Sequence, residues 1–153
     1  MQLSPHFSLK EFTESDTALR LGIDNTLPIN LMPAAENTAT LMESIRGHLS
    51  MLAGRPIAIQ ITSGYRCQQL NRAVGSGPLS DHLSMNAIDF KASAFGTPLE
   101  VCKALTPVFD SMRIGQLIYE HTWVHVSTRT PDKAINRVLT VNGKHYLPGI
   151  VEA

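Results

Sequence analysis

The sequence predicts an α+β fold in which N-terminal helices pack on a mainly antiparallel sheet. Helical patterns come first along the chain, and strand patterns that read as neighbours come mostly later. An Asn-Gly pair within the last strand region is typical of a tight hairpin. This order favours α+β over a doubly wound fold. The 153 residues suit a single domain, 1–153, that buries roughly two-thirds of the surface exposed by the unfolded chain.

Two helices are predicted before the first strand of the sheet. The pattern Ser-Leu-Lys-Glu at 8–11 is a capping box, so a helix begins there and runs toward Ala18, before Gly22. A loop follows. From 33 to 53, apolar or small residues recur every three or four positions, and Gly54 then provides a C-terminal stop. Residues 33–53 are therefore the predicted main amphipathic helix.

Strands and shorter helices follow in the second half of the chain. Alternating β-branched residues at 57–62 predict a strand, and a brief helix is predicted at 66–74. After a turn-rich loop, 86–91 is predicted as a strand. A threonine cap, a first-turn proline and an acidic third position predict a helix over 98–110. The remaining predicted strands are 116–120, 123–128 and the two arms of the hairpin in 137–146.

Charge and hydropathy argue against two classes of partner. Thirteen basic and thirteen acidic residues give zero formal net charge, so the electrostatic footprint of a nucleic-acid-binding protein is missing. No window approaches the roughly 18 apolar residues of a membrane span. The segment MQLSPHFSLKEF lacks a basic leader, an apolar core and a small-residue cleavage site, so we expect synthesis in the cytoplasm without a signal peptide. The expected assembly state is a monomer.

The stretch SDHLSMNAIDF at 80–90 contains a candidate metal-binding pair, His82 and Asp89. A buried strand would favour an apolar residue where Asp89 lies. The two residues are either ligands of one metal ion or a structural hydrogen-bonded pair. A catalytic zinc site uses three protein ligands from His, Asp or Glu and leaves the fourth position for water, so the metal hypothesis requires a third ligand.

His125 is the candidate third ligand. If Glu120 and Trp123 flank a two-residue turn, the paired strands bring Ile118 opposite His125. Period-two alternation then places all four side chains on one face of the sheet. Glu120 would lie diagonally across from His125, at a separation that suits a carboxylate acting on a water molecule rather than a direct ligand. A bulge or a longer loop would change this register.

Four motifs occur in a fixed order along the chain. They are SGYR at 63–66, NRAVG at 71–75, the S-x-H-x6-D arrangement of Ser80, His82 and Asp89, and WVHVS at 123–127. Together they resemble the zinc D-Ala-D-Ala carboxypeptidase family, particularly its short phage-type members. The opening HFSLKEFTESDTALRLGIDN also resembles those members, so the resemblance covers most of residues 6–128. It implies the hedgehog-like metallopeptidase fold, with a zinc site on the sheet.

The resemblance also implies roles for individual residues. His82, Asp89 and His125 would bind Zn²⁺. Arg66 would be the cation that faces the scissile carbonyl oxygen or a substrate carboxylate, which suits its permanent charge and bidentate geometry. Ser80 would be a substrate-contacting hydroxyl.

Two positions depart from the family pattern. Met85 stands where the family usually has a glycine, and Thr122 stands where an acidic base often lies. Glu120 is the nearest carboxylate in sequence and is therefore the predicted general base. Trp123 and His121 are predicted to contact substrate. The alternatives are that Trp123 packs beside the site and that His121 is a solvated turn residue.

The expected function is zinc-dependent hydrolysis of a peptide bond in bacterial peptidoglycan stem or cross-link peptides, of the D,D-carboxypeptidase or endopeptidase type, in a phage lysis enzyme. Such an enzyme would act on the cell wall after release by a separate lysis partner, or as part of a virion. The alternative is a non-catalytic zinc-containing binding or virion-structural module of the same fold, which Met85 and Thr122 keep open.

Overall fold

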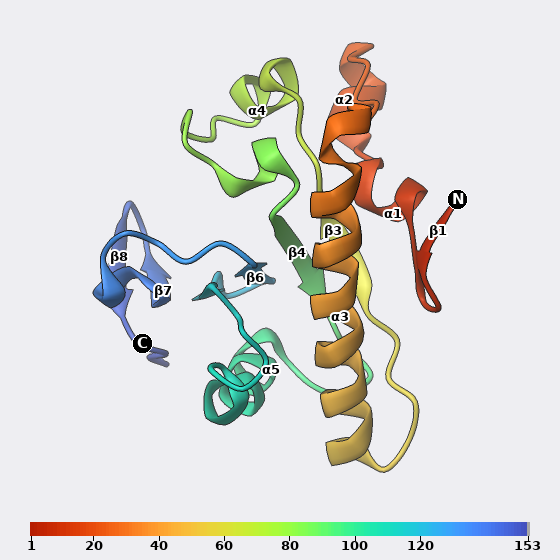
Figure 1. Ribbon diagram of the computed structural model, residues 1–153. Coiled ribbons are helices and arrows are strands. Elements are labelled where there is room, and N and C mark those ends of the chain that lie inside the picture. The colour runs from red at the N-terminus through yellow and green to blue at the C-terminus, as the bar shows by residue number, and fades with distance from the viewer. Residues whose placement is uncertain (153) are drawn as a thin grey trace.

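A computed structural model describes residues 1–152 and confirms the α+β fold (Figure 1). The main sheet has six strands in the order β3-β4-β6-β5-β7-β8, and its neighbours are antiparallel except for the parallel pair β5 and β7. Its strands are β3 (Gln60–Ser63), β4 (Ala87–Lys91), β5 (Gln116–Tyr119), β6 (Val124–Ser127), β7 (Val138–Asn142) and β8 (His145–Pro148). The short antiparallel pair β1 (Gln2–Ser4) and β2 (Phe7–Ser8) was not predicted.

The N-terminal helical region contains two helices where the sequence predicts one. The capping box is present and begins α1 (Leu9–Thr13). Glu14 then adopts an extended conformation, which ends α1. Ser15 is also extended, and its side-chain oxygen accepts a hydrogen bond from the backbone amide of Ala18, so Ser15 caps α2 (Asp16–Leu21). The prediction of one continuous helix is wrong because a second capping residue follows the first helix at once.

The later helices begin at or close to the residues at which the sequence predicts them to begin. Helix α3 (Met32–Ala53) ends at Gly54 with φ of 68°, as the stop signal predicts, and α4 (Gln68–Ala73) is a short helix. Helix α5 (Pro98–Leu105) begins at the predicted capping box but ends before the predicted 110. The chain continues as the 3₁₀ helix η3 (Thr106–Val108), whose proline lacks the N–H that an α-helix needs.

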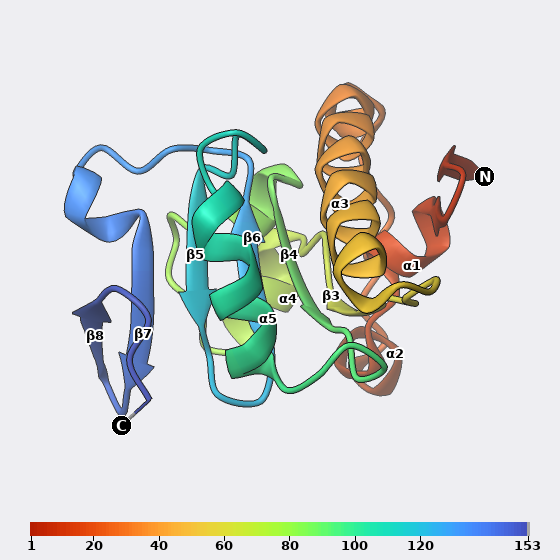
Figure 2. The ribbon, with the colours of Figure 1, turned by 90° about the horizontal axis from the view of Figure 1, so that it is seen from below.

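One face of the sheet packs against helices. Figure 2 shows α5 in front of β5 and β6, with α3 beside it over β4 and β3. The strand side chains on that face are apolar and fully buried, among them Ile88, Phe90, Leu117, Val124 and Val126. Alternate residues of the same strands point to the other face, where cross-strand pairing aligns Asp89 with His125 and His125 with Ile118. The sheet therefore has a core face and a face free to carry a site.

The C-terminal hairpin extends the sheet beyond β5. A connection that contains the 3₁₀ helix η4 (Ala134–Asn136) brings β7 parallel to β5, and β8 returns beside β7. Asn142 pairs with His145, so the turn residues are Gly143 and Lys144, one position later than an Asn-Gly turn would have. Gly143 has φ of 62°, which glycine adopts at little cost. Within residues 1–152, no helix is long and apolar enough to cross a membrane.

Candidate metal centre

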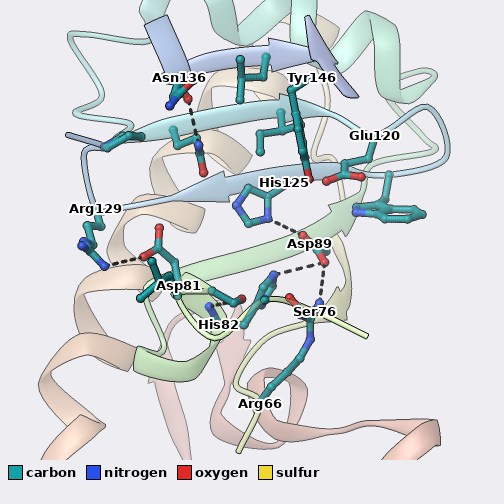
Figure 3. Close-up of a pocket in the computed structure, with 18 of the residues that line it drawn as sticks. Arg66, Ser76, Asp81, His82, Asp89, Glu120, His125, Arg129, Asn136 and Tyr146 are labelled. Carbon is teal, nitrogen blue, oxygen red and sulfur yellow. Dashed lines mark hydrogen bonds and ion pairs between the residues drawn. The ribbon is translucent and has the colours of Figure 1, made fainter. Parts of the chain in front are cut away.

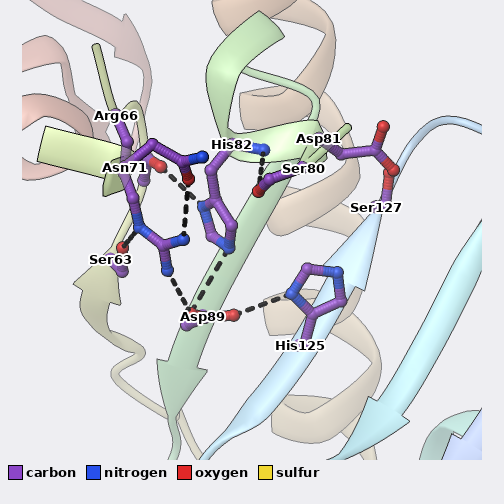
Figure 4. A network of polar contacts seen from close by, with 10 residues as sticks. Ser63, Arg66, Asn71, Ser80, Asp81, His82, Asp89, His125 and Ser127 are labelled. Atoms are coloured by element: carbon purple, nitrogen blue, oxygen red, sulfur yellow. Dashed lines mark hydrogen bonds and ion pairs between the residues drawn. The ribbon is translucent and has the colours of Figure 1, made fainter. Parts of the chain in front are cut away.

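Three titratable side chains gather on the open face of the sheet (Figure 4). Asp89 and His125 are cross-strand partners in β4 and β6, and Asp89 Oδ1 lies 2.8 Å from His125 Nδ1. His82 lies on the 3₁₀ helix η2 (Asp81–Ser84), and its Nε2 is 3.3 Å from Asp89 Oδ2. One possible ligand atom from each residue lies within 4.8 Å of the others. The fold thus brings together the three residues that were predicted to bind a metal.

Backbone contacts fix the orientation of His82. Its Nδ1 donates a hydrogen bond to the carbonyl oxygen of Gly64 at 2.7 Å, which leaves Nε2 directed at Asp89. The amide of Arg66 donates to the His82 carbonyl at 3.0 Å, and the His82 amide donates to Ser80 Oγ at 3.3 Å. A second ring N–H held by a carbonyl is the usual arrangement of a metal-binding histidine.

The turn after His82 forms although Met85 occupies the position where the resemblance predicts glycine. Met85 has φ of 62°, a left-handed conformation that glycine adopts more easily. Its side chain is fully buried in the core, and its carbonyl oxygen accepts a hydrogen bond from Thr38 Oγ1 at 2.8 Å. Burial of the thioether offsets the backbone strain, so the loop still delivers the chain to β4.

The protonation states of the buried ligands suit metal binding. Burial opposes ionisation of Asp89, but hydrogen bonds from His125 and His82, together with their charges, hold its pKa well below the ordinary value. Burial lowers the pKa of His82, although Asp89 partly counteracts this. Near neutral pH, Asp89 is therefore a carboxylate and His82 is neutral, which are the states that coordinate a metal.

The residues present fit a zinc ion. Two imidazoles and one carboxylate are among the ligand sets that zinc uses in catalytic sites, with ligand distances of about 2.0–2.2 Å. The three possible ligand atoms lie within 4.8 Å of one another, so small side-chain movements would be enough for them to hold one ion. The cluster also lies in a cleft, which leaves room for a water molecule or a substrate at a fourth position.

Arg66 extends the cluster toward β3 and α4. Its Nη2 lies 3.4 Å from Asp89 Oδ2, its Nε donates to Ser63 Oγ at 3.2 Å, and its Nη1 lies 3.5 Å from Asn71 Oδ1. Burial lowers the pKa of Arg66, whereas the charges of Asp89 and Glu120 raise it. An arginine remains protonated under these conditions, so a fixed positive charge borders the cluster.

A cleft of about 790 Å³ runs over the cluster, which is in the size range of ligand sites (Figure 3). Its lining includes the three candidate metal ligands, Arg66 and Glu120. The family model described as Peptidase M15 matches residues 5–127, which is most of the chain. The chain belongs to the peptidase M15 family. No curated protein matches the sequence significantly.

Membership of the M15 family supports peptidase activity on a peptide substrate. Peptidases of this family are typically zinc-dependent, and the His-Asp-His cluster could hold such an ion. The matched segment contains all four sequence motifs that carry the resemblance and all three candidate ligands. It ends at residue 127, so the connection after β6 and the β7–β8 hairpin lie outside it.

The strand register predicted around Glu120 is confirmed in this M15 protein. Ile118 pairs with His125, and the amide of Glu120 donates to the carbonyl of Trp123 at 3.2 Å. Glu120 is half-buried and lines the cleft. Burial raises its pKa most, and the neighbouring charges of His125 and Asp89 act in opposite directions. A carboxylate with a raised pKa is a better proton acceptor and donor near neutral pH than an ordinary one.

The three predicted substrate-contacting residues are placed differently. Ser80 lines the cleft, and its Oγ also caps η2 by accepting the His82 amide. Trp123 is half-buried in the cleft lining, and its Nε1 is buried without a hydrogen-bond partner among the described residues. His121 is exposed, is not part of the cleft lining, and donates from Nε2 to the carbonyl of Val141 at 2.6 Å.

The turn between β5 and β6 places His121 outside the cleft lining, and its contact with substrate stays a prediction. It has φ of 66° at the turn between β5 and β6. The centroid of its ring lies 4.6 Å from that of Tyr119, with the two rings tilted by 46°, and its hydrogen bond reaches across to β7. His121 therefore ties the turn to the neighbouring strand. Thr122 is also exposed at this turn and supplies no carboxylate to the cleft.

Sequence reasoning missed the role of Asn71, which supports the site from outside the cleft lining, and the place of Tyr146, which comes from a distant segment. Asn71 is buried, and it contacts Arg66 and donates to the carbonyl of Gly77 at 2.9 Å, which fixes the loop before Ser80. The NRAVG motif contained this signal, but only the fold shows which side chain it supports. Tyr146 lines the cleft, and nothing in its local sequence predicted this.

Proposed function

We propose that this M15 peptidase hydrolyses a peptide bond in bacterial peptidoglycan stem or cross-link peptides, with zinc held by His82, Asp89 and His125. One observation carries the proposal. The three donors lie on the floor of an open cleft, with a carboxylate, Glu120, and a guanidinium, Arg66, also in its lining. This set supplies the groups that metal-assisted peptide hydrolysis requires.

Zinc bound at these donors would polarise the scissile carbonyl and lower the pKa of a water molecule. Glu120 accepts the proton of the attacking water and then donates it to the leaving amine. Its raised pKa makes it able to do both. Arg66 binds the carbonyl oxygen or a substrate carboxylate, because its contacts with Ser63 and Asp89 keep the charged guanidinium group in one orientation.

The proposed setting is phage lysis or virion entry. The resemblance of residues 6–128 to short phage-type members supports it. The enzyme would reach the wall through a separate lysis partner or as a virion component. The substrate is a peptide in either case, and we propose that the protein acts as a monomer.

The test is mass spectrometry of fragments released from purified sacculi by the zinc-loaded protein. We expect peptide products whose masses identify the cleaved bond, and loss of these products after chelation. Glu120→Gln is the matched control, since it retains the shape of the side chain without its basicity. We expect it to keep stoichiometric zinc and to lose about 10²–10⁴-fold in turnover, the usual contribution of a general base.

The alternative function is a non-catalytic zinc-containing module of the same fold. The observation that favours it is that Thr122 supplies no acid at the family position. The same experiment separates the two functions. Intact sacculi from several wall types, together with full zinc occupancy, would support the non-catalytic module, and wild-type rates in Glu120→Gln would remove Glu120 from the mechanism.

A further inference from the structure

One wall of the cleft comes from a segment outside the part of the chain that matches the M15 family. The match ends at residue 127. The cleft lining nevertheless includes Arg129, Asn136, Leu139 and Tyr146. The last two belong to β7 and β8, the hairpin at the edge of the sheet. The hairpin therefore adds to this cleft a surface that the family motifs do not supply.

Strand register places Tyr146 on the same face of the sheet as the metal cluster. Cross-strand partners share a face, and Asp89, His125, Ile118 and Leu139 are successive partners across β4, β6, β5 and β7. Alternation along β7 adds Val141 to this face, and Tyr146 pairs with Val141. The position of Tyr146 thus follows from the pairing of five strands rather than from the choice of a side-chain rotamer.

The exposure of Tyr146 distinguishes it from the other tyrosines. Tyr65 and Tyr119 are 7% and 8% exposed and belong to the core, whereas Tyr146 is 56% exposed. More than half of its surface therefore remains available to a ligand. A phenol can donate and accept a hydrogen bond while its ring covers apolar parts of a peptide.

Tyr146 lies beside the predicted general base. Figure 3 shows its ring descending from β8 so that the hydroxyl points toward the carboxylate of Glu120, while Arg66 lies on the other side of Asp89. Partial burial raises the pKa of the Tyr146 hydroxyl, and the charge of Glu120 raises it further, so the phenol stays protonated near neutral pH. It can therefore act as a hydrogen-bond donor.

We propose that Tyr146 contacts the peptide on the leaving-group side of the scissile bond, and that the β7–β8 hairpin thereby determines which peptides the cleft accepts. This proposal rests on the proposed function. Because Glu120 returns its proton to the leaving amine, the residue that carries this amine must lie next to Glu120. Tyr146 is the aromatic side chain on the hairpin side of that position. Its hydroxyl would bond a backbone carbonyl or carboxylate oxygen of the leaving residue.

The test compares Tyr146→Ala and Tyr146→Phe with the wild-type zinc-loaded protein on soluble muropeptides. The matched control is His145→Ala, because His145 is exposed and neighbours Tyr146 on the opposite face of β8. We expect Tyr146→Ala to raise KM at least tenfold and Tyr146→Phe to raise it a few-fold. We expect zinc content to stay stoichiometric in all variants and His145→Ala to keep the wild-type KM.

Binding is measured separately from turnover. Trp123 is the single tryptophan and lies in the cleft lining, so its fluorescence reports occupancy in a Glu120→Gln background. We expect the muropeptide titration to show the same loss of affinity for Tyr146→Ala. Wild-type KM and wild-type affinity in both Tyr146 variants would overturn the proposal.

The two proposals fail in different ways. If the wild-type protein binds muropeptides without cleaving them, the proposed function fails and the titration still decides the role of Tyr146. Weaker binding by Tyr146→Ala would then support the contact, and equal binding would overturn it. If the wild-type protein neither cleaves nor binds muropeptides, both proposals are overturned.

Discussion

At Met85, an unfavourable backbone conformation is opposed by favourable burial of the side chain. Its left-handed backbone costs about 1–2 kcal/mol relative to glycine. Its side chain is fully buried, and truncation of a buried methionine costs about 2–5 kcal/mol. The packing energy exceeds the strain, so a methionine can occupy a position where the family usually has glycine.

Met85→Gly should therefore destabilise the protein, although it restores the family residue. Relief of strain recovers only part of the lost packing, and we expect the free energy of unfolding to fall by about 1–4 kcal/mol. Urea unfolding monitored by circular dichroism measures this. A variant more stable than wild type would show that the backbone strain, rather than the packing, dominates at this position.

His125→Ala tests the third metal ligand. The variant leaves Asp89 and His82 in place but removes the donor that lies 2.8 Å from Asp89 Oδ1. We expect the zinc-to-protein ratio after dialysis to fall from about one to well below one, since two ligands hold zinc weakly. His145→Ala is the control, because it removes an exposed histidine outside the cleft lining. Full zinc occupancy in His125→Ala would mean that another residue is the third ligand.

At the scale of the elements, the contact between α1 and the segment that follows β3 supports the orientation of His82. The amide of Tyr65 donates to the carbonyl of Phe12 at the end of α1. This close approach leaves no space for a side chain at Gly64, since a Cβ there would lie 2.2 Å from the same carbonyl oxygen. The Gly64 carbonyl in turn orients His82. The glycine of the SGYR motif thus connects helix packing to the metal site.

Gly64→Ala should disturb stability and metal binding together. The backbone must move to relieve the contact with Phe12, and this movement displaces the carbonyl that holds His82 Nδ1. We expect a loss of more than about 2 kcal/mol in stability and about 10–100-fold in zinc affinity, the usual cost of losing a contact that orients a ligand. Thermal melts and zinc titrations against a competing chelator measure both.

Gly47→Ala is the matched control for Gly64→Ala. It lies within α3, and a Cβ there meets no atom within 4 Å. Since alanine is the better helix former by about 0.5–1 kcal/mol, we expect unchanged zinc affinity and equal or higher stability. Unchanged zinc affinity in Gly64→Ala as well would separate the glycine from the metal site.

Across the whole molecule, the sheet separates stability from the site. The core face of β4, β5 and β6 packs against α3 and α5 and contains none of the candidate ligands. The opposite face carries the cluster and the cleft. Arg66 pairs with Asp89 in addition to the two histidines, so the carboxylate retains partners when no metal is bound.

Metal removal should therefore leave the protein folded but less stable. We expect the chelator-treated protein to retain its far-ultraviolet circular dichroism spectrum and to melt at a lower temperature. Zinc at 100 times its dissociation constant should restore about 2.7 kcal/mol, because it binds the folded state. Calorimetry with increasing zinc measures this. Loss of secondary structure on chelation would show that the metal, rather than the core face, holds the fold.

The sequence by itself determined the α+β class, the three candidate ligands and the register around Glu120. Periodicity, caps and the alternation of two strands joined by a short turn predict the fold class and the register. The roles of the candidate ligands are implied by the resemblance of the four motifs to the zinc D-Ala-D-Ala carboxypeptidase family. Two predicted helix boundaries were wrong. Ser15 begins a second helix directly after α1, and α5 ends before its predicted end because Pro107 follows it.

Only the tertiary structure decided what surrounds the ligands. The place of Asn71 beside Arg66, the close approach of Gly64 to Phe12, and the turn of His121 toward β7 depend on contacts between segments that are distant along the chain. Tyr146 is the clearest case, because its face is set by pairing across five strands. A sequence specifies which residues are available for chemistry, but the packing of distant strands decides which of them share a cleft.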